Sequence, residues 1–98
     1  MTHIVWTEPA IADLDGIHDY ISRDSEIYAD SVVLEIVEAA ERLGSYPESG
    51  RVVPEVGEGS IREIIVGGYR VIHEVASDHI LMLTVLHAAR QFPEGLSE

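Results

Sequence analysis

The spacing of apolar residues changes partway along the chain, and this change limits the possible folds more than any other feature. Up to Gly44 the apolar residues recur every three or four positions, as on one face of a helix. From Ile61 onward they form short, β-branched runs separated by tight turns. A loop rich in proline and glycine, residues 45–60, lies between the two halves. Helices followed by strands indicate an α+β fold, and 98 residues suit a single domain spanning 1–98.

The first half begins with a short predicted strand, His3 to Thr7, and continues into two helices. Thr7 can cap the first helix, Ser25 can cap the second, and Gly44 is a natural end for the second. The residues expected to face the core are Ile11, Leu14, Ile17 and Ile21 in the first helix and Ala29, Val32, Val33, Ile36, Val37, Ala40 and Leu43 in the second. Asp13, Asp15 and Asp19 fall on other faces of the first helix. Because few residues separate the helices, we expect an antiparallel helical hairpin.

The second half contains three predicted strands, over Ile61 to Val66, Tyr69 to Val75 and Ile80 to Ala88. The Gly67-Gly68 pair predicts a tight hairpin turn between the first two, and residues 76–79 predict a second turn. These strands should form an antiparallel meander with the helical hairpin on one face of the sheet. A short extended piece is also expected at Val52-Val53.

The last predicted strand is apolar on both faces, with Leu81, Leu83 and Val85 on one and Ile80, Met82 and Leu86 on the other. Alternation with polar residues is expected where one face of a sheet meets water. The second face should therefore be covered, either by another element of the chain or by a partner.

The charge of the chain is strongly negative, with 18 acidic and 6 basic residues and a formal net charge of -12. Every basic residue is an arginine. Phosphates repel such a protein unless its arginines gather at one place, so direct nucleic-acid binding is not expected. The acidic composition has two explanations that stay open: a solvated acidic surface, or a partner of opposite charge.

Several short motifs, in order along the chain, resemble the RelE/ParE toxin superfamily, and ParE-type toxins in particular. The motifs are Val5-Trp6-Thr7 with Ala10, Asp13, Leu14, Ile17, Tyr20 and Ile21; Leu43 with Pro47, Gly50 and Arg51; Arg62-Glu63; Gly68-Tyr69-Arg70-Val71-Ile72; and Val85-Leu86-His87 with Arg90. The resemblance covers residues 4 to 92, and no motif is specific by itself. It implies the toxin of a type II toxin–antitoxin, or plasmid stabilisation, system. It also implies a cognate antitoxin whose C-terminal segment wraps the toxin and neutralises it in a hetero-oligomer.

The resemblance leaves three functions open. ParE-like members inhibit DNA gyrase by binding it and are not known to be enzymes, whereas RelE-like members cut messenger RNA on the ribosome. A third reading is an inactive member that only binds an antitoxin. The charge and the absence of lysine favour gyrase inhibition without catalysis; if the chain is an enzyme, it is an endoribonuclease.

Ribonuclease chemistry would need a general base, a general acid and cations for the phosphate. The candidates are His87, Tyr69, Glu63, Arg62, Arg70 and Arg90, of which His87, Arg70 and Arg90 would be the catalytic set. Three of these candidates have a simpler reading: His87 at the edge of the core, Arg70 paired with Glu74 or Glu63, and Arg62 paired with Glu63. Arg51 is expected to order its loop.

The residues expected at the antitoxin interface are Arg62, Arg70, Ile80, Met82, Leu86 and Arg90. Because the toxin is acidic, the antitoxin segment is expected to alternate apolar residues with lysine or arginine. The five histidines show no paired metal-ligand spacing, so neither a metal nor another cofactor is expected. No apolar run reaches the roughly 20 residues of a membrane span and no signal peptide is recognisable, so a cytoplasmic protein without membrane contact is expected.

Overall fold

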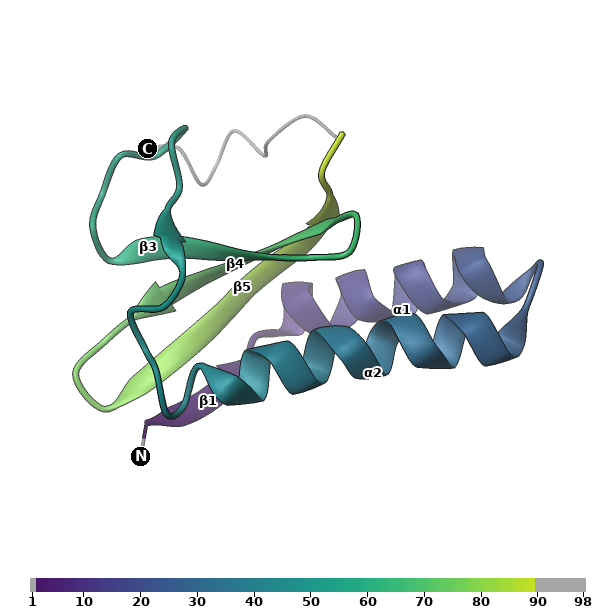
Figure 1. Ribbon diagram of the computed structural model, residues 1–98, viewed down its shortest axis with the longest axis horizontal. Helices are drawn as coiled ribbons and strands as arrows, with labels where there is room; N and C mark the ends of the chain where they lie inside the picture. The colour runs from purple at the N-terminus through teal and green to yellow at the C-terminus, as the bar shows by residue number, and fades with distance from the viewer. Residues whose placement is uncertain (1, 90–98) are drawn as a thin grey trace.

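The computed structural model describes residues 2–89 and has two helices packed on one face of a five-stranded sheet (Figure 1). In chain order the elements are β1 (His3–Trp6), α1 (Glu8–Ser22), α2 (Glu26–Arg42), β2 (Arg51–Val52), β3 (Ile61–Val66), β4 (Tyr69–Val75) and β5 (His79–His87). Within the described residues, neither helix is long and apolar enough to cross a membrane. The fold is α+β, as the sequence predicts.

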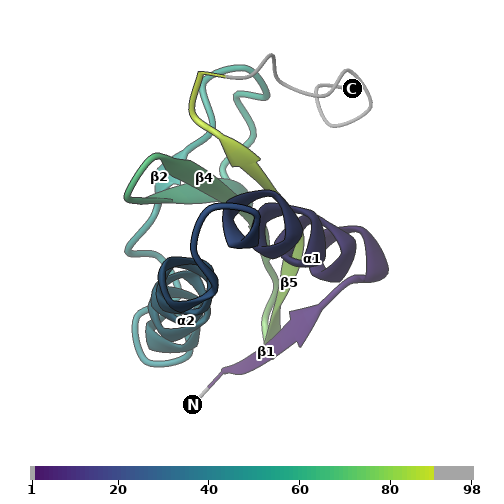
Figure 2. The ribbon, with the colours of Figure 1, turned by 90° about the vertical axis from the view of Figure 1, so that its right-hand side faces the viewer.

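Both helices begin at the predicted capping residues. The Thr7 hydroxyl accepts a hydrogen bond from the backbone N–H of Ala10, and the Ser25 hydroxyl accepts one from Tyr28. These side chains satisfy backbone donors that the first turn of a helix leaves without partners. Figures 1 and 2 show α1 and α2 side by side and antiparallel, which confirms the predicted hairpin.

The sheet is larger than the predicted meander and is mixed rather than antiparallel. Its strand order is β1-β5-β4-β3-β2, and β1 runs parallel to β5 from the pair His3 and His79 to the pair Trp6 and Met82. The predicted meander forms its centre, as β3, β4 and β5. The prediction was incomplete because a parallel pair has a long connection, here residues 7–78, which local turn signals do not reveal.

An irregularity in β5 changes which of its side chains face the helices. Ile72 of β4 pairs with Thr84, but the next residue, His73, pairs with Met82, so Leu83 is an extra residue without a partner in β4. Such a β-bulge interrupts the alternation of side chains between the two faces of a strand. The regular alternation assumed from the sequence therefore fails at Leu83.

Because of the bulge, Ile80, Met82 and Val85 all belong to the core beneath the helices, where Ile80 and Met82 are fully buried. Leu86 belongs to a second cluster on the opposite face. The prediction that Ile80, Met82 and Leu86 share one face that a partner could cover is thus wrong. The second cluster consists of Val53, Ile72 and Leu86, with Val56, Ile61 and Leu83 packed against it. Part of the loop between β2 and β3 covers this face.

The helical stripe is buried unevenly. Ile36 of α2 is fully buried in the core, whereas Ile17 of α1 is only half-buried. Ile11 is 47% exposed, so its predicted place in the core is wrong. The preceding residue, Ala10, is buried in the core instead of Ile11.

Candidate functional site

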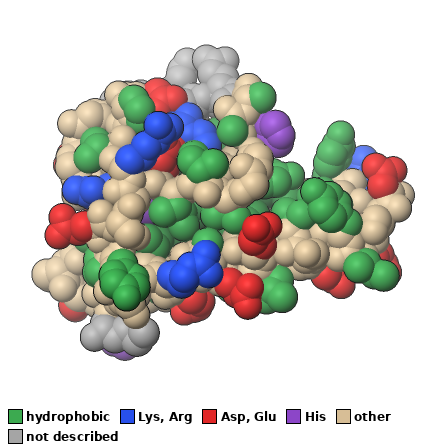
Figure 3. Space-filling view, in the orientation of Figure 1, with side chains coloured by type: hydrophobic (Ala, Val, Ile, Leu, Met, Phe, Trp, Pro, Cys, Tyr) green, Lys and Arg blue, Asp and Glu red, His purple; other side chains and the backbone are tan. Residues whose placement is uncertain are grey.

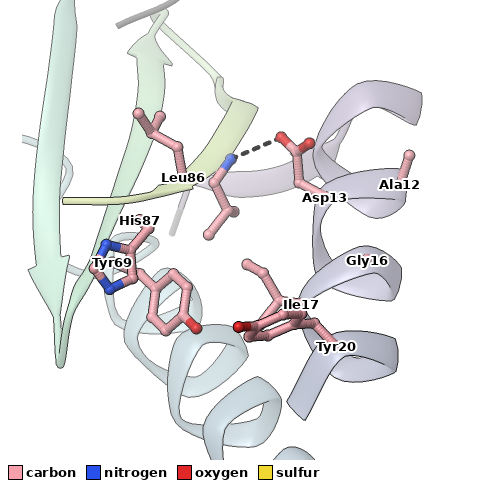
Figure 4. Close-up of a pocket in the computed structure, with 9 residues that line it drawn as sticks. Ala12, Asp13, Gly16, Ile17, Tyr20, Tyr69, Leu86 and His87 are labelled. Atoms are coloured by element: carbon pink, nitrogen blue, oxygen red, sulfur yellow. Dashed lines mark hydrogen bonds between the residues drawn. The ribbon is translucent and has the colours of Figure 1, made fainter. Parts of the chain in front are cut away.

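A cleft of about 540 Å³ lies between α1 and the sheet, where β4 begins and β5 ends (Figure 4). Its sheet side is formed by Tyr69 and His87, which are cross-strand partners and whose rings meet edge to face with centroids 5.5 Å apart. Its helix side includes Gly16 and Tyr20 of α1. In Figure 4 the hydroxyl groups of Tyr69 and Tyr20 point toward one another across the cleft.

His87 is exposed at the C-terminal end of β5. Its Nδ1 accepts a hydrogen bond of 3.2 Å from the backbone N–H of Ala89. In the neutral ring the proton must then be on Nε2, which is left as a donor. His87 lies on the helix side of the sheet beside buried Val85, but its own side chain is exposed and is not part of the core cluster.

Asp13 joins α1 to the edge of β5. Its carboxylate oxygen Oδ2 accepts a hydrogen bond of 3.0 Å from the backbone N–H of Val85 and another from the Thr84 hydroxyl. Because β1 ends opposite Met82, this part of β5 has a neighbouring strand only on its β4 side, and on the other side Asp13 supplies the acceptor that a strand would have given. The spacing of apolar residues placed Asp13 on another face of α1. Such spacing indicates which residues pack in the core, and it does not indicate a hydrogen bond to the backbone of a distant strand.

Four charged side chains meet on the sheet face opposite the helices. Arg70 donates from Nε to Glu63, at 2.6 Å, and from its two terminal nitrogens to the two oxygens of Glu55, at 2.8 Å each. Arg51 donates from Nε to the other oxygen of Glu63, at 2.6 Å. The side chain of Glu63 is fully buried and that of Arg70 is only 10% exposed. The hydrogen bonds from Arg70 lower the pKa of Glu55 to about 2.

This cluster confirms one predicted pair and corrects another. Arg70 pairs with Glu63, as the sequence indicated, and not with Glu74. Arg62 does not pair with Glu63: it donates to the backbone oxygens of Gly50 and Gly59 and forms an ion pair of 3.6 Å with Glu48. Adjacent residues of a strand point to opposite faces, so the predicted pair between neighbours could not form.

Glu55 was missed by the sequence reasoning, since nothing in a loop of prolines and glycines marks one glutamate as an arginine partner. Arg51, expected to order its loop, lies in β2 within that loop and donates to Glu63 of the adjacent β3. On the face that Figure 3 shows, acidic side chains lie beside the arginine side chains.

The structure separates the residues proposed for catalysis. Arg70 pairs across the sheet with Leu86, and His87 pairs with Tyr69, so Arg70 and His87 project from opposite faces. Arg90 lies outside the described residues. No group of three or more metal-binding side chains occurs in residues 2–89.

Comparisons with known proteins agree on one family. Residues 4–92 match the family model described as the ParE toxin of the type II toxin–antitoxin system parDE. The chain is 36% identical over 91 residues to Toxin RelE2 of Caulobacter vibrioides, an alignment that covers 92% of this chain and 99% of that protein. A solved structure of the chromosomal ParDE TA system from P. aeruginosa superposes with a TM-score of 0.74 at 26% identity, covering 89% of this chain and 96% of that one. The chain is therefore a toxin of the RelE/ParE superfamily and belongs to the ParE toxin family of type II toxin–antitoxin systems.

Proposed function

We propose that this toxin acts by binding and inhibiting DNA gyrase, without catalysis, and that a cognate antitoxin neutralises it in a hetero-oligomer. Similarity to the ParDE system supports the antitoxin partner. The choice of gyrase over messenger RNA rests on the arrangement of the candidate catalytic side chains.

The separation of His87 from Arg70 carries this choice. Cleavage of RNA requires a base, an acid and a phosphate-binding cation around a single phosphate. His87 lies on the helix side of the sheet, whereas the guanidinium of Arg70 lies on the opposite side and bonds to Glu55 and Glu63. Its charge is thus balanced by carboxylates of the same chain. The net charge of -12 further opposes approach to RNA.

The test is induced expression of the toxin alone and together with its antitoxin, followed by assays of plasmid supercoiling and messenger cleavage. Expression alone should reduce plasmid supercoiling and arrest growth, and the antitoxin should restore both. Prompt, codon-linked cleavage of messenger RNA with normal supercoiling would refute gyrase as the target.

The variant His87→Ala should keep its toxicity in the same assays, because a protein-binding inhibitor has no need of a general base. His79→Ala is the matched control, since His79 lies at the other end of β5 with its side chain 38% exposed. A loss of messenger cleavage of about a hundredfold or more in His87→Ala alone would identify His87 as a catalytic acid or base.

A further inference from the structure

We infer that the cleft between α1 and the ends of β4 and β5 binds an arginine or lysine side chain that a protein partner inserts into it. The inference rests on the proposal that this toxin acts by binding other proteins. It assigns the cleft a ligand chemistry, and three features of the cleft support that assignment.

The first feature is a glycine that the fold itself does not need. Gly16 lies in the middle of α1, where glycine is less favourable than alanine because more backbone freedom is lost on folding. A Cβ atom at this position would meet no heavy atom within 4 Å, so no internal packing requires the glycine. Gly16 lines the cleft beside Tyr20, where a side chain larger than a methyl group would occupy space that a ligand could fill.

The second feature is the chemistry of the walls. Tyr20 and Tyr69 are both aromatic, and a cation is attracted to the face of a tyrosine ring within about 6 Å of its centroid. Neither hydroxyl makes a hydrogen bond within residues 2–89, so both are available as acceptors. Asp13 also lines the cleft, and only its Oδ2 is used by β5, which leaves Oδ1 for an incoming donor.

The third feature is charge complementarity. A formal net charge of -12 attracts basic segments and repels acidic ones. Ile17 and Val85 give the lining of the cleft an apolar part, and the hydroxyls of Tyr69 and Tyr20, which point toward one another across the cleft in Figure 4, give it a polar part. A long side chain with an apolar stem and a charged head matches both parts, and arginine and lysine are the side chains of this kind.

The test is an NMR titration of the isotope-labelled full chain with N-acetyl-argininamide. The neutral isostere N-acetyl-citrullinamide and the apolar N-acetyl-leucinamide serve as comparison probes. The arginine probe should shift the backbone amides of Gly16, Tyr69 and His87, and the citrulline probe should bind about tenfold more weakly because it lacks the charge.

Variants at two positions sharpen the test. Gly16→Leu should block the cleft and abolish binding, whereas Gly16→Ala, which adds only a methyl group, should bind the probe as the parent chain does. Asp13→Asn keeps an oxygen that can accept from Val85 but removes the charge, and it should weaken binding by about tenfold. Both Gly16 variants remove a helix-interior glycine, so the fold is expected to persist.

The inference is overturned if the leucine or citrulline probe binds as tightly as the arginine probe, if the shifts map to another surface, or if no shift occurs. These results would leave inhibition of gyrase untouched. Conversely, a chain that binds the arginine probe in the cleft but does not affect supercoiling would refute the proposed target and keep the cleft assignment.

Discussion

Replacing Arg70 with methionine tests whether this arginine stabilises the fold. The change leaves the Glu63 carboxylate fully buried, with Arg51 as its remaining cationic partner among residues 2–89, and the side chain of Arg51 is 63% exposed. Breaking a buried ion pair by removing one partner costs about 3–5 kcal/mol. Because Arg51 remains, we expect the lower end, about 3 kcal/mol. The lost pair with Glu55, whose side chain is 40% exposed, adds little because water screens it.

The expected loss is large for a domain of this size. One kcal/mol corresponds to roughly 4–8 °C in a domain of up to about 100 residues, so the melting temperature should fall by about 12–24 °C. Chemical denaturation monitored by circular dichroism measures the same loss. The denaturant concentration at the midpoint of unfolding should fall, and the slope of the unfolding free energy against denaturant concentration should stay unchanged.

Two further variants separate this explanation from a general effect of removing a charge. The double variant Arg70→Met with Glu63→Leu should recover much of the stability, because no buried charge is left without its partner. Arg23→Met is the control: its pair with Asp19 is exposed and 3.7 Å long, so the loss should be below about 0.5 kcal/mol. A loss below about 1 kcal/mol for Arg70→Met, or a double variant as unstable as the single one, would refute the reasoning.

Three other predictions concern the fold. Ile36→Ala should lower the free energy of unfolding by about 2–5 kcal/mol in chemical denaturation, and Ile17→Ala should lower it clearly less, because Ile36 is fully buried and Ile17 only half-buried. Equal losses would mean that the core is misplaced. Gly50→Ala should destabilise the protein, since the added Cβ would lie 2.7 Å from a backbone oxygen of β3. Gly16→Ala should instead stabilise it by about 0.5–1 kcal/mol. The opposite order of denaturation midpoints would contradict this expectation. Burial lowers the pKa of His73 below its ordinary value of 6.5, so the unfolded state binds a proton first and stability should decline as the pH falls below about 6.5. His73→Leu should flatten this decline in denaturation curves between pH 7 and 5; an identical slope in the variant would exclude His73 as its source.

The elements of this fold were predictable because each carries its own local signal. Thr7 and Ser25 cap helices with side chains that reach only three residues ahead. Gly67 has a φ of +58°, a conformation that glycine adopts without strain, so the predicted turn between β3 and β4 forms there. The strands Ile61–Val66 and Tyr69–Val75 have the predicted bounds.

The relations between distant elements were not predictable in the same way. The pairing of β1 with β5 joins residues about 76 positions apart, and no turn between them fixes its register. The bulge at Leu83 results from how β4 and β5 align, so the residues of β5 alone do not reveal it. The bulge changed the predicted faces of β5, because it moves Leu86 to the face opposite Met82.

The candidate site shows the same division. The pair of Arg70 and Glu63 was predictable because both lie on neighbouring strands of a hairpin. The bidentate contact with Glu55 depends on how a loop folds over the sheet, and the bond from Asp13 to β5 depends on where β1 ends. The sequence therefore indicated the family but not the cleft.

The measurement that tests the central claim most directly uses purified components. Purified toxin is added to purified gyrase with relaxed plasmid and ATP, and in parallel to ribosomes translating a defined messenger RNA. Gyrase inhibition predicts a dose-dependent loss of supercoiling that addition of the antitoxin reverses, and intact messenger RNA. Unchanged supercoiling at a toxin concentration that cleaves the messenger RNA would contradict it.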